Sequence, residues 1–198
     1  MICGNLFFSF LDHITDIFIA TGLLGFALST LHLQQVSRRK IRDSHRDFWR
    51  LAMINLLLTL CFWIAAEITG NALFDLLTGA VFLMGFAMSV VTGMLIKIVS
   101  FLIWLHLQAA TEGIQTDGHR KYSVPKMKKI IHSGTSDVLL VMLLAAQISL
   151  IVSILHPEYL GIITAICWLV FFSLLLITLA RPVIRYYEII RELASESV

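Results

Sequence analysis

Residues 160–180 read LGIITAICWLVFFSLLLITLA, a run of 21 residues without a charged side chain. A bilayer core of about 30 Å is spanned by roughly 20 apolar residues in a helix. Lipid offers no hydrogen bonds to the backbone, so such a segment must satisfy its own backbone groups as an α-helix. The run therefore predicts a transmembrane helix.

Four other segments meet or approach the same requirement of length and apolarity: 14–33, 51–68, 76–107 and 138–155. The composition agrees, because 58% of the 198 residues are hydrophobic and only 14% are charged. A soluble domain carries about 25% charged residues. We therefore predict an all-α fold, a polytopic membrane helix bundle. It forms a single membrane domain over residues 1–198 with five transmembrane helices.

The basic residues predict the orientation of this bundle. Fourteen of the 15 Lys and Arg residues fall in 34–50, in 108–137 or after residue 180. The opposite ends of the predicted helices carry acidic charges and no Lys or Arg: Asp12, Asp16 (at the outer edge of its helix), Glu67, Asp75 and Glu158. By the positive-inside rule the N-terminus lies outside and the C-terminus inside. The clustered charge is thus explained by a lipid bilayer and not by nucleic acid.

Two regions leave alternatives open. The segment 76–107 would be about 47 Å long as a straight helix, more than a bilayer core requires. It either tilts and projects into the cytoplasm or bends near Lys97. Beyond Pro182, which we place at the end of the fifth helix, residues 183–193 are expected to form a short amphipathic helix at the membrane surface.

Lys97 is the one basic residue outside the clusters. It continues a line of small residues spaced four apart, Gly85, Ser89 and Gly93, which would allow another helix to approach closely. Lys97 is then expected to face protein, where an intramembrane charge is a functional candidate. The alternative is that its long side chain snorkels to the inner headgroups.

Two histidines occur in matching contexts. His32 and His106 each lie in a Leu-His-Leu-Gln sequence near the cytoplasmic end of an outward-to-inward helix. His32 also shares a face with Gly22, Gly25 and Ser29. Neutral imidazole is a good haem ligand, and small neighbours leave room for a macrocycle, so His32 and His106 are candidate cofactor ligands. The alternative is that each histidine only marks a helix end at the headgroups.

A metal site on the outer face is a further hypothesis. Asp12 and Asp16 lie one helical turn apart, and together with His13 and His156 they offer ligands for a divalent cation or Cu²⁺. The alternative is a solvated acidic rim. The remaining histidines, His45, His119 and His132, lie in basic segments and are expected to be exposed to solvent.

The segment GFAMSVVTGMLIKIVSFLIWLHLQ, residues 85–108, resembles a hallmark of bacterial inner-membrane proteins related to subunit I of the haem–copper oxidases. In that family the segment runs Gly-Met-Leu-Tyr-Lys-Ile-Val-Pro-Phe-Leu-Val-Trp-Leu-His. The matching positions are Gly93, Met94, Leu95, Lys97, Ile98, Val99, Phe101, Leu102, Trp104, Leu105 and His106. Ile96 replaces the tyrosine and Ser100 the proline, and the chain resembles the C-terminal half of the family only.

The resemblance implies a redox-associated protein of electron transport in the bacterial inner (cytoplasmic) membrane, an oxidase subunit I-like component linked to haem or copper. Lys97 and His106 are the positions carried over. The alternative function is a non-enzymatic membrane scaffold, partner subunit or permease-like fragment, acting with a membrane protein partner or as a homo-oligomer. A truncated relative without function also stays open. The sequence identifies no catalytic residue and so leaves enzymatic activity undecided.

The predicted orientation is testable by cysteine labelling. Single cysteines placed at Arg42 and Lys128 should react with an impermeant reagent only from the cytoplasmic side, because both belong to the basic clusters. A cysteine at Glu158 should react only from outside. Labelling of positions 42 and 128 from opposite sides would contradict the five-helix topology.

Overall fold

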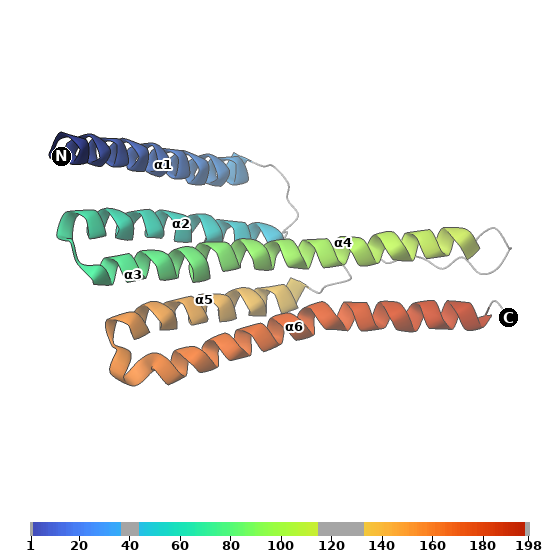
Figure 1. Ribbon diagram of the computed structural model, residues 1–198. Helices are drawn as coiled ribbons and strands as arrows, with labels where there is room; N and C mark the ends of the chain where they lie inside the picture. The colour runs from blue at the N-terminus through green and yellow to red at the C-terminus, as the bar shows by residue number, and fades with distance from the viewer. Residues whose placement is uncertain (1, 37–43, 115–132, 197–198) are drawn as a thin grey trace. The chain divides into compact units, whose positions relative to one another are not determined.

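The computed structural model describes residues 2–36, 44–114 and 133–196, and these ranges are helical apart from short turns (Figure 1). The helices are α1 (Ile2–Val36), α2 (Ser44–Thr69), α3 (Ala72–Ala80), the π-helix η1 (Val81–Ala87), α4 (Met88–Ile114), α5 (Ser133–Leu155) and α6 (Pro157–Glu196). Most of the basic clusters, with His119 and His132, lie outside the described residues.

Within the described ranges, five segments are long and apolar enough to cross a membrane. They are Ile14–Val36, His45–Thr69, Ala72–Ala109, Gly134–Leu155 and Leu160–Arg191. The all-helical fold and the five membrane-compatible helices are thereby confirmed. The orientation in the membrane stays a prediction, as does the single membrane domain.

The contacts divide the chain into two compact units. The first unit comprises Met1–Arg42 and Arg50–Met88, and therefore α1, most of α2, α3 and η1. The second unit comprises Asp43–Trp49 and Ser89–Val198, and therefore the start of α2 together with α4, α5 and α6.

A tight turn joins α2 to α3 in the first unit. Gly70 adopts a positive φ of 62° and donates its N–H to the Ala66 carbonyl at 2.8 Å, which ends α2. Glycine adopts this left-handed conformation without a Cβ penalty. The Asn71 side chain then accepts from the Leu73 N–H at 3.0 Å and caps α3. The sequence Gly-Asn thus sets the two helices side by side as a hairpin.

The long segment predicted over 76–107 is irregular near its start and does not bend near Lys97. The π-helix Val81–Ala87 interrupts it, whereas α4 runs through Lys97 without a break to Ile114. Leu77, Val81 and Gly85 are buried at a spacing of four residues. A regular α-helix rotates such positions away from a common face by about 40° per step. The slower winding of a π-helix reduces this drift.

The small residues of this segment are packed closely, as their spacing predicted. A Cβ on Gly85 would lie 2.9 Å from the side chain of Asn55, within the first unit. In the second unit, a Cβ on Gly93 would lie 2.9 Å from the Cβ of Phe48. Ser89 is fully buried and accepts a hydrogen bond from the Gln147 amide at 3.2 Å.

The prediction that Lys97 continues this packed line is wrong, because its side chain is exposed. Two steps of four residues carry position 97 about 80° around the helix from position 89. The packed face instead continues through Ile96 and Ser100, which are 6% and 7% exposed. Within its own unit the lysine therefore contacts solvent or lipid, and the snorkelling alternative stays a prediction.

Helices α5 and α6 form an antiparallel hairpin in the second unit, as Figure 1 shows. Near the connection the Thr164 hydroxyl donates to the Ser149 carbonyl at 2.9 Å, which joins the two helices. Leu139, Leu143 and Ala146 on α5 and Phe171 on α6 are at most 1% exposed. Apolar side chains therefore form the core of the unit, and hydrogen bonds such as Thr164 to Ser149 join its helices.

Residues 183–193 are helical, as predicted, but they do not form a separate helix, because α6 continues from Pro157 through Pro182 to Glu196. Proline lacks the N–H that would bond to the carbonyl of Thr178, and it normally kinks or ends a helix. Local adjustments and neighbouring Ser and Thr side chains allow proline inside membrane helices. The Thr178 hydroxyl donates to the Leu174 carbonyl at 2.7 Å, so it does not replace the bond that the Thr178 carbonyl lacks.

The close packing at Gly93 predicts the effect of adding one methyl group. Gly93→Ala should lower the free energy of unfolding by about 1–3 kcal/mol, because the backbone beneath Phe48 must shift. Thermal unfolding of the purified protein in detergent measures this effect. Gly161→Ala is the matched control, since a Cβ there meets nothing within 4 Å. Equal stability of the two variants would contradict the packing.

Candidate functional site

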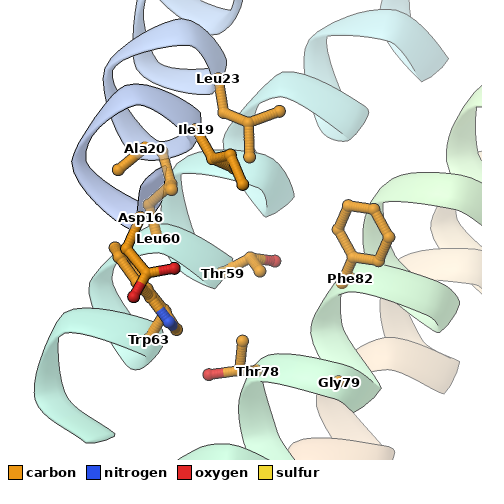
Figure 2. Close-up of a pocket in the computed structure, with 10 residues that line it drawn as sticks. All are labelled: Asp16, Ile19, Ala20, Leu23, Thr59, Leu60, Trp63, Thr78, Gly79 and Phe82. Atoms are coloured by element: carbon orange, nitrogen blue, oxygen red, sulfur yellow. The ribbon is translucent and has the colours of Figure 1, made fainter. Parts of the chain in front are cut away.

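The first unit contains a pocket of about 280 Å³ between three of its helical segments (Figure 2). This volume is close to the lower limit of about 300 Å³ for small-molecule sites. Most of the lining is apolar. The residues are Asp16, Ile19, Ala20 and Leu23 from α1, Thr59, Leu60 and Trp63 from α2, and Thr78, Gly79 and Phe82 from α3 and η1.

Helical spacing places the lining residues. Thr59 and Trp63 lie four residues apart on α2, and Thr78 and Phe82 lie four residues apart across α3 and η1, so each pair shares a face. Figure 2 shows the ring of Phe82 on the side of the pocket opposite to Asp16. The pocket is therefore bounded by an acidic side and an aromatic side.

The polar atoms of the lining are mainly hydrogen-bond acceptors. The Thr59 hydroxyl donates to the Asn55 carbonyl at 2.9 Å, and the Thr78 hydroxyl donates to the Phe74 carbonyl at 2.8 Å. Each hydroxyl proton is thus used within its own helix, and only lone pairs remain for a ligand. The Asp16 carboxylate adds two acceptor oxygens, whereas the Trp63 indole supplies one N–H donor.

The pocket lies well inside the α2–α3 hairpin. Trp63 is six residues before Thr69, where α2 ends, and Thr59 is ten residues before it. These separations correspond to about 9 and 15 Å along the helix axis. The pocket that Asp16 shares with Trp63 and Thr59 is therefore one to three helical turns away from the α2–α3 turn, among membrane-compatible helices.

The Asp16 side chain is half-buried in the pocket wall. Among the described residues that line the pocket, none is a Lys, Arg or His. Asp16 lies near the start of the membrane-compatible segment Ile14–Val36, and an ionisable residue within such a segment is a functional candidate. Asp16 is accordingly the residue on which the candidate site is built.

The predicted outer metal site is not tested. Asp16 belongs to the first unit and His156 to the second, and the side chains of Asp12 and His13 lie outside the described part of the structure. Among the side chains that are described, no three His, Cys, Asp or Glu residues are grouped to hold a metal ion. Asp12, His13, Asp16 and His156 therefore stay a hypothesis as metal ligands.

The two histidines proposed as haem ligands lie in different units, and each is exposed. His106 is oriented by its own helix, since its Nδ1 lies 2.8 Å from the Leu102 carbonyl oxygen. A carbonyl oxygen only accepts, so Nδ1 is the donor in this contact. The Tyr186 ring contacts the imidazole edge-on, with centroids 6.3 Å apart.

His45, which we expected in solvent, is half-buried in α2. Its Nδ1 lies 3.0 Å from the Gly93 carbonyl oxygen, and its ring contacts the Trp49 ring edge-on at 5.9 Å. The expectation was wrong because α2 begins at Ser44, so the basic residues around His45 are helical and pack against α4.

The sequence alone did not bring Asp16 together with Thr59, Trp63, Thr78 and Phe82. The available signals were an acidic residue within an apolar run and the two four-residue spacings. Four-residue spacings are frequent in any membrane helix, so they do not identify a pocket without the relative rotation of the helices.

No known protein family, curated protein sequence or solved structure matches this chain. The resemblance to haem–copper oxidase subunit I-like proteins therefore stays a hypothesis carried by residues 85–108.

Proposed function

We propose that this chain is a multi-pass protein of the bacterial cytoplasmic membrane that serves as a partner subunit in a larger membrane assembly. In the proposed arrangement its N-terminus faces outward, its C-terminus faces the cytoplasm, and α1 forms the contact with the partner. The five apolar helices support the membrane location. The partner is a membrane protein or a second copy of this chain.

The observation that carries this proposal is the open small-residue face of α1. Gly22, Gly25, Ser29 and His32 share a face by their spacing of three and four, and all four are exposed. A Cβ on either glycine meets nothing within 4 Å. In membranes, such faces allow helix backbones to approach closely.

The burial of α1 agrees with a docking role. Only 6% of its most apolar window is buried, compared with 44% of that of α2. The glycines at positions 85 and 93, by contrast, are already covered by neighbouring side chains. An additional helix on α1 would bury the face that its own unit leaves open.

The docking role of α1 is testable by changing the shape of this face. Gly25→Leu should block close approach of another helix and remove most of the assembled species. Native mass spectrometry of protein extracted in mild detergent measures the effect, because the single chain has a mass of 22.3 kDa.

Gly161→Leu is the control, since Gly161 is an equally open helical glycine on α6. It should leave the assembly unchanged. A wild-type protein that is extracted as a single chain, or an assembly that withstands Gly25→Leu, would contradict the docking role.

A redox-associated function linked to haem or copper is the second candidate, and the geometry of His106 favours it. Metal-ligating histidines almost always donate their second ring N–H to a carbonyl, a carboxylate or water. The Nδ1–H of His106 is directed to the Leu102 carbonyl, which leaves an exposed Nε2 for an iron or copper ion. The resemblance over residues 85–108 supports the same position.

The absorption spectrum of the purified protein tests this second candidate. A bound haem would give a Soret band, and His106→Ala should reduce or shift this band because it removes an axial ligand. His156→Ala is the control, since that histidine is equally exposed and lies outside residues 85–108. Protein without a Soret band and without bound copper would exclude this function.

A further inference from the structure

The pocket of the first unit points to a ligand that neither proposed function includes. We propose that it binds a lipophilic ammonium ion, a small apolar molecule that carries a protonated amine. The amine would lie against the Asp16 carboxylate, and the apolar body would lie between the helices.

The choice of an ammonium follows from the hydrogen-bonding capacity of the pocket. The hydroxyl protons of Thr59 and Thr78 are donated to backbone carbonyls of their own helices, so these two lining residues can offer a ligand only acceptor lone pairs. None of the described lining residues is a Lys, Arg or His that would face the Asp16 carboxylate. Three residues with acceptor oxygens, one of them a carboxylate, match a cation with N–H donors.

The remainder of the lining matches the body of such a ligand. Leu60 and Leu23 supply apolar walls, and Trp63 and Phe82 supply aromatic rings. Aromatic rings attract ammonium groups through their negative faces, and this attraction is stronger where water is excluded. One polar end and one apolar end in the same pocket require an amphiphilic ligand.

The pocket favours a free amine over a phospholipid with an amine headgroup. A volume of about 280 Å³ is small for a ligand with two acyl chains. In addition, none of the described residues that line the pocket is a Lys or Arg that could bind the phosphate accompanying a lipid amine. Both sources share the ammonium group, so the membrane composition of the test separates them.

The experiment measures binding of radiolabelled phenylbutylamine to the full-length protein in nanodiscs of phosphatidylcholine and phosphatidylglycerol. Phenylbutanol, which has a similar body but no charge, serves as the comparison ligand. The amine should bind at least about tenfold more tightly than the alcohol, as expected for a charge-assisted hydrogen bond. Equal binding of the two compounds would overturn the proposal.

Variants then locate the site. Asp16→Asn should weaken amine binding by about tenfold or more and leave alcohol binding unchanged, whereas Asp16→Glu should retain most of the affinity. Asp75→Asn is the matched control, because Asp75 is an exposed acid of the same unit that does not line the pocket. An equal loss in Asp16→Asn and Asp75→Asn would overturn the site, as would no loss in either.

Two further measurements complete the test. Thermal unfolding establishes that Asp16→Asn is folded, and if it is not, the comparison of amine with alcohol on the unaltered protein decides. Addition of phosphatidylethanolamine to the nanodiscs separates the two sources of the ammonium group. Unchanged amine binding supports a free amine as the ligand, whereas competition by the lipid overturns that choice and assigns the site to a lipid headgroup.

Discussion

In a lipid environment, each hydrogen-bond donor of a helix must find its acceptor within the protein, and this constraint accounts for most of the structure. Backbone groups are satisfied by helix formation. Five hydroxyl groups follow the same rule: Thr21, Thr59, Thr78, Ser100 and Thr178 each donate to a carbonyl four residues earlier in the same helix. The buried Thr92 hydroxyl is an exception among the described residues. A hydroxyl oxygen that donates its proton in this way still has lone pairs with which it can accept a hydrogen bond. The acceptor character of the pocket around Asp16 is therefore a consequence of the constraint that makes the chain helical.

Small residues serve two different purposes in this protein. Gly85 lies against Asn55, and Gly93 lies against Phe48. The space that a side chain would take at each glycine is therefore occupied by a neighbour within the same unit. Gly22 and Gly25 have the same chemical character, yet nothing approaches them. Helices in lipid associate through close van der Waals packing more than through a hydrophobic driving force. An open glycine face is for this reason a surface on which a second helix gains contacts.

The sequence was a good guide wherever the physical rule depends on one helix alone. The five membrane-compatible helices follow from length and apolarity, and the close approach at Gly85, Ser89 and Gly93 follows from their spacing. The packed position predicted for Lys97, the exposure predicted for His45 and the helix end predicted at Pro182 were wrong. Each of these depends on the exact rotation or continuation of a helix. A rotation of a helix by a few tens of degrees about its axis decides whether a side chain is packed or exposed. The spacing of residues in the sequence does not predict this rotation so closely.

The sequence by itself determined that this chain is helical and apolar enough to reside in lipid, because backbone hydrogen bonding in a bilayer permits few alternatives. It also marked Asp16 and His106 as unusual residues. The tertiary structure decided what surrounds them. It joined Asp16 to Thr59 and Trp63 in one pocket, and it fixed the proton of His106 on Nδ1 through the Leu102 carbonyl. Such arrangements depend on how helices rotate and which rotamers they allow, and these properties are set by packing between segments distant in sequence.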